Sequence, residues 1–422
     1  MPAALTLNST ALRQRLAQLG LRPWWLAEQL GVDRRTVLRW VNGQVRHIQQ
    51  PQAKALADVL NCPLDELLLH EPHTLLATPQ DQRAAGTALA SSTLLDRLGP
   101  VGEWDVIEQL VRAAAVPDLP LHVLGRLHHQ LCVACWRQDK LNEARQHNDS
   151  TLAIAHRCGD KSLLADALGS RANLQFWRGD WPAAQGSWHE ALALSHWLTP
   201  RQRGALHSNL GASQAEAGAP EQGRAQLLLA LACFDIDGTP MNHSIARAHL
   251  ALIALMAGET DEGEEQAARA HAAAQNGDYR RGLALSHLLR AQAAAQRGQE
   301  ADTRRALEQA GQAFAELGIV EANTSLLAAR ALRWLGDGAG ALAAAQEALH
   351  RNTRLPLELA AALHEQALAL HLLGRIAEAA SAARSAAKAY RRCGATPPAV
   401  SPAVSPAVSP DVTRQPAAVA LR

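Results

Sequence analysis

A recurrence of about 40 residues constrains the fold of this chain more than any other feature. Glycines between one helical stretch and the next stand at steps of 39, 40, 40, 38 and 38 residues: Gly179, Gly218, Gly258, Gly298, Gly336 and Gly374. Glycine closes a helix C-terminus in the left-handed conformation at little steric cost. Each glycine begins a similar phrase of small and amphipathic residues, such as GAPEQGRAQLLLALA. Paired helices with this period predict a solenoid over residues 101–394.

Composition favours an all-α chain. Long stretches of Ala, Leu, Arg, Gln and Glu at helical spacing, and an aromatic content of only 4%, disfavour a β-sandwich or barrel. The sequence has no uninterrupted apolar run long enough for a transmembrane helix, and its first residues lack the basic region that precedes a signal-peptide core. We therefore expect a cytoplasmic protein with no membrane partner.

Residues 1–70 form a small basic unit. They carry eight basic and five acidic residues, a formal charge of +3, whereas the remainder carries 33 basic and 35 acidic residues, or −2. Five short helices are predicted: one with a stripe of Leu12, Leu16 and Leu19, one opening at Pro23, one over 34–41 capped by Asp33, one from residue 51, and one around 64–68. A glycine turn between the second and third gives the layout of a helix-turn-helix.

The stretch LAEQLGVDRRTVLRWVNGQ, followed by ALADVLNCPLDELL, resembles the Cro/C1-type (XRE family) helix-turn-helix. The resemblance implies that the third helix lies in the major groove of double-stranded DNA. It places Arg34, Arg35 and Arg39 at base edges, Thr36 and Asn42 nearer phosphates, and Arg46 at the backbone or minor groove. Independently, Arg35 and Arg39 are four residues apart and share a helix face, and arginine pairs bidentately with guanine. The alternative is a merely exposed basic face, or one that touches only phosphate.

The repetitive region resembles tetratricopeptide repeats, most closely in SNLGASQAEAGAPEQGRAQLLLALA. This implies a right-handed α-solenoid of helix pairs, with an inner groove lined by the first helix of each pair. The residues nine positions before each glycine form one column on those helices, and by resemblance Asn209 in this column would clamp a peptide backbone. The candidate groove residues are Asn209 and His249 in this column and, beside it on the same helices, Asn173, Arg290, Arg330 and His364. The alternative is that they are ordinary solvated side chains of a concave face.

This combination resembles the peptide-sensing regulators of the Rgg/PlcR/PrgX type. The resemblance implies transcription regulation by a homodimer whose repeat domain binds a peptide or other effector, as in quorum sensing. The alternative is a protein-interaction scaffold whose head only tethers it to DNA or is degenerate. The recognition helix, with its three arginines and intact Asp33 cap, favours the regulator.

No catalytic signature is present. The chain has no P-loop, no Gly-x-Gly-x-x-Gly, no Gly-x-Ser-x-Gly and no His-Glu-x-x-His, so we predict no enzymatic activity and no cofactor. Cys132 and Cys135 have metal-site spacing, but no second pair follows and apolar residues surround them. We therefore expect them to pack in a core and predict no metal site.

Two segments are expected to lie outside these domains. Residues 71–100 predict a linker that runs into a first connecting helix. Residues 395–422, with their SPAV repeats, cannot bury a core and predict a disordered tail.

Overall fold

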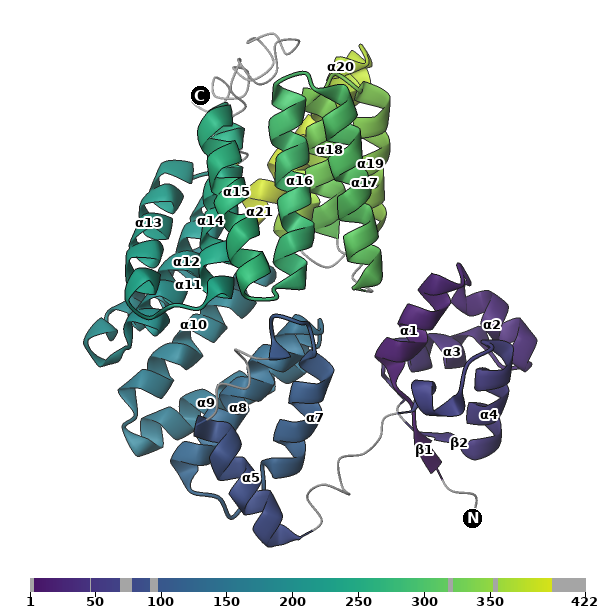
Figure 1. Cartoon of the computed structure of the whole chain (residues 1–422), viewed down its shortest axis with the longest axis vertical. Helices are drawn as coiled ribbons and strands as arrows, with labels where there is room; N and C mark the ends of the chain where they lie inside the picture. The colour runs from purple at the N-terminus through teal and green to yellow at the C-terminus, as the bar shows by residue number, and fades with distance from the viewer. Residues whose placement is uncertain are drawn as a thin grey trace, which may run out of the picture. The chain divides into compact units, whose positions relative to one another are not determined.

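The computed structural model describes residues 4–45, 47–68, 78–91, 98–317, 322–351 and 356–396. The chain divides into two compact units, Met1–Gln82 and Arg83–Arg422 (Figure 1). Beyond residue 396 the predicted tail lies outside the described residues, as do residues 71–77 and 92–97 of the predicted linker. None of the described helices is both long and apolar enough to cross a membrane.

The first unit contains the predicted order of short helices. They are α1 (Ser9–Gln18), α2 (Pro23–Leu30), α3 (Arg34–Val41), α4 (Gln50–Val59) and η1 (Leu64–Leu67). The fifth is a single 3₁₀ turn rather than an α-helix. Leu12 and Leu16 are buried as predicted, but Leu19 is 42% exposed, because α1 ends at Gln18 and Leu19 is its C-cap. The first unit thus has the predicted order of helices, but only two of the three predicted leucines of α1 face its core.

A two-stranded sheet ties the beginning of this unit to the segment after α3. Strand β1 (Ala4–Thr6) runs antiparallel to β2 (His47–Gln49), with Leu5 opposite Ile48. The sequence did not predict this sheet, because each strand has three residues and no hairpin turn links them. Ile48 joins the buried core of the unit, so the sheet adds to the packing.

The second unit is a succession of helices. It begins within α5 (Pro79–Ser91) and continues with α7 (Trp104–Ala114). Seven pairs follow within the described residues: α8 (Leu121–Arg137) with α9 (Leu141–Cys158), α10 (Lys161–Trp177) with α11 (Trp181–Leu192), α12 (Pro200–Glu216) with α13 (Pro220–Asp237), α14 (Pro240–Ala257) with α15 (Thr260–Asn276), α16 (Arg280–Gln296) with α17 (Glu300–Glu316), α18 (Ala322–Trp334) with α19 (Gly338–Arg351), and α20 (Pro356–Leu372) with α21 (Ile376–Arg392). A short 3₁₀ helix, η3 (Ser195–Trp197), precedes α12. The predicted all-α helix-pair array is confirmed.

The turn inside each pair uses a left-handed residue. All six glycines of the recurrence have positive φ, between 69° at Gly298 and 94° at Gly218. The α8–α9 turn uses Asp139 instead, with φ 59°. Aspartate tolerates this conformation better than most residues, so the turn forms without glycine. The glycine recurrence therefore begins at the second of the seven pairs, although the predicted array of residues 101–394 includes the first.

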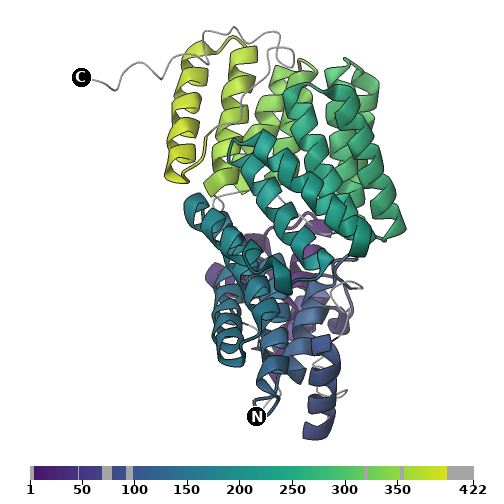
Figure 2. The same cartoon turned by 90° about the vertical axis from the view of Figure 1, so that its left-hand side faces the viewer.

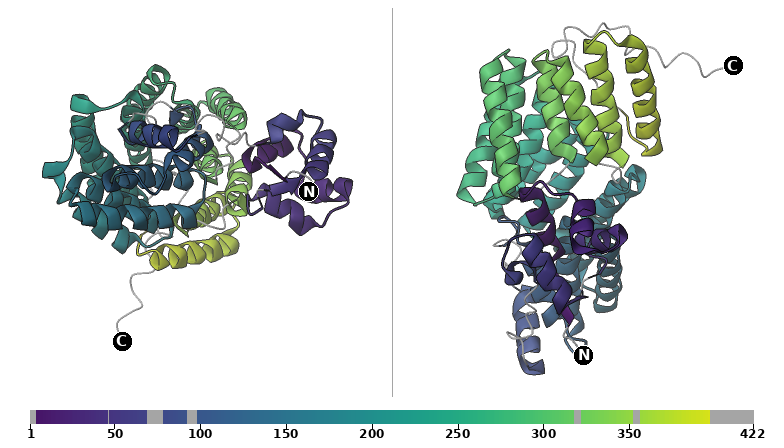
Figure 3. Two further views of the ribbon diagram at one scale, coloured as in Figure 1. Left: turned by 90° about the horizontal axis from the view of Figure 1, so that it is seen from below. Right: turned by 90° about the vertical axis from the view of Figure 1, so that its right-hand side faces the viewer.

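The last pair packs back onto the turns at the ends of α10 and α12. Tyr390, Cys393, Leu357 and Ala217 belong to one buried cluster, against which Trp181 also packs. The Trp181 amide donates to the Cys393 carbonyl at 3.3 Å, and the Thr396 amide donates to the Ala217 carbonyl at 3.0 Å. Figures 2 and 3 show the yellow C-terminal pair, α20 and α21, ending beside the teal segment that contains α10, α11 and α12. We call this contact the array closure, because it joins the end of the array to a pair far earlier in the chain.

Candidate DNA interface and repeat interior

The residues that begin α3 also determine which of its faces is open. Gly31, with φ 63°, ends α2, and the Asp33 carboxylate accepts a hydrogen bond from the Arg35 amide at 2.7 Å. Such a cap satisfies a backbone donor that would otherwise lack a partner. Val37 and Trp40 are buried in the core of the unit. The opposite face of α3 is consequently directed to solvent.

Three arginines lie on this open face. Arg34, Arg35 and Arg39 are exposed, and within the described residues of the first unit no acidic side chain pairs with them. Arg15 is a contrasting case, because its guanidinium donates to the Leu60 and Asn61 carbonyls at 3.1 and 2.6 Å and closes the end of α4. The guanidinium groups of the three α3 arginines make no such contacts among the described residues. They leave a basic surface suited to a polyanion.

The other predicted DNA contacts flank these arginines. Asn42 is exposed and is the C-cap of α3, whereas Thr36 is partly buried. Arg46 lies outside the described residues. One exposed residue of the face, Leu38, was not singled out from the sequence, although its spacing of three residues from Arg35 places it on that face.

The six candidate groove residues all lie on first helices of the pairs. They are Asn173 on α10, Asn209 on α12, His249 on α14, Arg290 on α16, Arg330 on α18 and His364 on α20. Each of these helices contacts the next in the series, so together they form one continuous layer. Arg290 is exposed, Arg330 is nearly buried, and the other four side chains are partly buried. Whether these residues bind a ligand remains a prediction.

Arg330 has a partner within the array. Its Nε lies 2.9 Å from Oε1 of Glu365, and the Nε of Arg333 lies 2.8 Å from the other carboxylate oxygen. Glu365 is only 2% exposed. Burial alone would raise its pKa, but the guanidinium groups of Arg333 and Arg330 lower the pKa of Glu365 to about 2. Arg330 is thus a member of a buried ion-pair triad rather than an open groove side chain.

The two candidate histidines, His249 and His364, have pKa values lowered well below neutral pH. Burial, with a smaller contribution from Arg281, lowers the pKa of His249 to about 4. Burial likewise lowers the pKa of His364 to about 4, although the neighbouring Glu365 carboxylate opposes the shift. A neutral imidazole offers one hydrogen-bond donor and one acceptor. These side chains can therefore interact with a neutral polar ligand.

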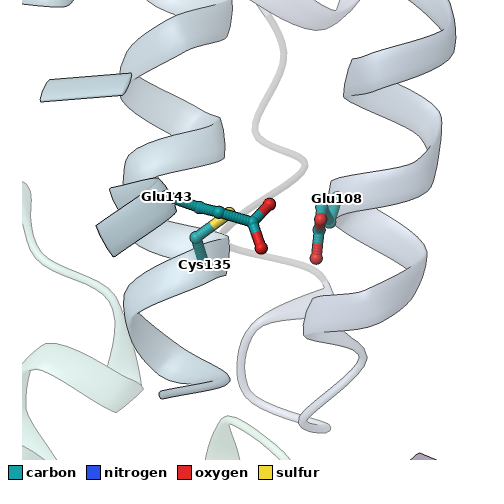
Figure 4. Close-up of side chains that lie close together, drawn as sticks. All are labelled: Glu108, Cys135 and Glu143. Atoms are coloured by element: carbon teal, nitrogen blue, oxygen red, sulfur yellow. The ribbon is translucent and has the colours of Figure 1, made fainter. Parts of the chain in front are cut away.

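Glu108, Cys135 and Glu143 approach one another closely enough to raise the question of a metal site (Figure 4). One ligand atom from each lies within 4.8 Å of the others. However, Arg112 pairs with Glu108 at 2.7 Å and with Glu143 at 2.6 Å, and Lys140 also pairs with Glu108. Burial raises the pKa of the Cys135 thiol to about 12. The cluster is an ion-pair network between helices, and the burial of Cys135 and its neighbour in the C-x-x-C pair confirms the core prediction.

The family model for the helix-turn-helix matches residues 12–67. No curated protein matches the chain. Among solved structures, the chain is similar to the type IV pilus biogenesis factor PilW, with 19% identity, 56% of this chain and 96% of that chain covered, and a TM-score of 0.39. The chain is also similar to a tetratricopeptide repeat protein from Parabacteroides merdae, with 16% identity, 65% of this chain and 99% of that chain covered, and a TM-score of 0.39. A third similar structure is Bacillus thuringiensis PlcR in complex with the peptide PapR7 and DNA, with 13% identity, 73% of this chain and 94% of that chain covered, and a TM-score of 0.31.

The match over residues 12–67 and the geometry of α2 and α3 define the first unit as a helix-turn-helix domain. The second unit is a tetratricopeptide-like array of helix pairs. This is the architecture of a DNA-binding regulator with a helical repeat domain, as the sequence predicted.

Proposed function

We propose that this protein is a sequence-specific transcriptional regulator that reads double-stranded DNA with α3. The observation that carries the proposal is the open face of that helix, where Arg34, Arg35 and Arg39 lack acidic partners among the described residues. Arginine is the side chain best suited to bidentate hydrogen bonds with guanine in the major groove. Asn42 and Thr36 supply phosphate contacts in this proposal, and Arg46 contacts the backbone or the minor groove.

The array, in this proposal, forms a homodimer and binds an effector, a peptide or another small polar ligand, on the layer of first helices. Asn173, Asn209 and the neutral His249 offer donors and acceptors of the kind that an extended peptide main chain needs. Exposed Arg290 supplies a positive charge at the same layer. A two-fold dimer would present two heads to half-sites separated by about one helical turn, or ~34 Å.

Replacing both Arg35 and Arg39 by alanine should weaken specific DNA binding by at least about 30-fold, because two bidentate guanine contacts at ~1–3 kcal/mol each together contribute at least about 2 kcal/mol. The measurement is the affinity of the full chain for duplexes selected from random DNA, at about 0.15 M salt with competitor present. The matched control is Arg269→Ala/Arg305→Ala, which removes two exposed arginines from the array. Equal affinities for all three proteins would contradict the proposal and favour a head that acts only as a tether.

The effector part has its own test. Screening a library of short extended peptides should recover binders whose affinity falls at least about 10-fold in Asn209→Ala, through the loss of main-chain hydrogen bonds. Asn276→Ala, an exposed asparagine at the end of the second helix α15, is the matched control. If the recovered peptides bind Asn209→Ala as tightly as wild type, or if the library yields no binders, the proposal that the effector is a peptide is wrong.

A further inference from the structure

The open face of α3 carries one apolar residue among its arginines. Leu38 is 37% exposed and belongs neither to the buried core of the first unit nor to the partly buried apolar residues around that core. It follows Arg34 by four residues and Arg35 by three, so it lies beside both of these arginines on the helix surface. An apolar side chain left open within a basic face requires a partner that is both anionic and locally apolar.

The major groove of DNA provides such a partner. Its rims are phosphates, and the one apolar group that its base edges present is the 5-methyl group of thymine. An apolar protein surface fits this face poorly, because docking it on Leu38 would also bury the neighbouring guanidinium groups without partners.

We infer that Leu38 reads the 5-methyl group of a thymine next to the bases that Arg34 and Arg35 contact. This inference rests on the proposed function and adds to it a specificity-determining residue. It assigns to each half-site a thymine adjacent to guanine. Leu38 acts by excluding water from the methyl group rather than by hydrogen bonding.

The experiment uses the full chain and duplexes selected from random DNA. In the recovered site each thymine is replaced, one at a time, by deoxyuridine, which lacks only the methyl group. At one position in each half-site we expect a loss of about 4-fold in wild-type affinity, the equivalent of one buried methyl group. Leu38→Ala should bind the thymine and deoxyuridine duplexes equally at that position. Leu19→Ala, which truncates an exposed leucine outside α3, should retain the penalty.

The outcomes separate this inference from the proposed function. A specific site in which no deoxyuridine changes wild-type affinity overturns the inference and leaves the regulator intact. The same penalty in wild type and Leu38→Ala also overturns it, because another residue would then contact the methyl group. A selection that recovers no sequence overturns both proposals. The wild-type scan needs no variant, so folding of Leu38→Ala cannot obscure the result.

Discussion

Replacing Glu365 by alanine should lower the free energy of unfolding of the array by about 3–5 kcal/mol, the usual cost of removing one member of a buried ion pair. The carboxylate holds Arg330 through one oxygen and Arg333 through the other, and all three side chains are buried. Its removal leaves two guanidinium groups in a site that water reaches poorly. Because the triad spans α18 and α20, the loss should loosen the packing between the last two pairs.

Chemical denaturation at pH 7, followed by circular dichroism, measures this effect. Glu378→Ala is the control, because it removes a glutamate of the same pair from an exposed contact with Arg375 and should leave unfolding nearly unchanged. The triple variant Glu365→Ala/Arg330→Met/Arg333→Met should regain much of the loss, since it removes the two buried guanidinium groups as well. A triple variant as unstable as Glu365→Ala would show that packing, not uncompensated charge, causes the loss.

The same triad also makes the stability of the array depend on pH. The pKa of Glu365 is lowered from 4.5 to about 2, so the folded state favours its charged form. Its contribution to stability is therefore complete above the unfolded value and is lost as the pH falls toward the folded one. The stability difference between wild type and Glu365→Ala should stay constant from neutral pH down to about 4.5 and shrink below it.

The sequence predicted the features that depend on local signals. Helix pairs followed from left-handed glycines at a fixed period, and the recognition helix followed from Asp33 and the spacing of Val37 and Trp40. Asp139 shows the limit of the glycine signal, because a second residue type fills the same turn. Leu19 shows another limit, since a helical stripe does not reveal where the helix stops.

Features that depend on pairing across repeats could not be predicted in the same way. The sequence predicts an open groove position for Arg330, because its partner Glu365 lies in the next helix pair and no local pattern connects the two residues. The array closure joins Thr396 to Ala217, and no periodic signal shows that the array returns to that turn. Such contacts depend on the accumulated curvature of all the intervening pairs.

Tyr390→Ala should destabilise the array closure by about 3–5 kcal/mol, the usual cost of truncating a large buried aromatic side chain. Tyr390 is 1% exposed and packs in the cluster that joins the last pair to Ala217. Its removal leaves a cavity at the point where α21 meets the turn before α11. The two backbone hydrogen bonds of the closure, from the amides of Trp181 and Thr396, should then open more often.

Amide hydrogen exchange provides the specific measurement, because it reports local opening that a global unfolding curve averages. The amides of Trp181 and Thr396 should exchange much faster in Tyr390→Ala than in wild type, whereas Tyr390→Phe should keep their protection because it retains the ring. Phe314→Ala truncates a buried aromatic in the cluster of α16, α17 and α18, away from the closure, and should leave these two amides protected. Loss of protection in both alanine variants would mean that the array opens as a single unit. Loss of protection in Tyr390→Ala alone would mean that the array closure opens independently of the rest of the array. An effector bound to the first helices could then shift this opening equilibrium, provided that its affinities for the open and closed forms differ.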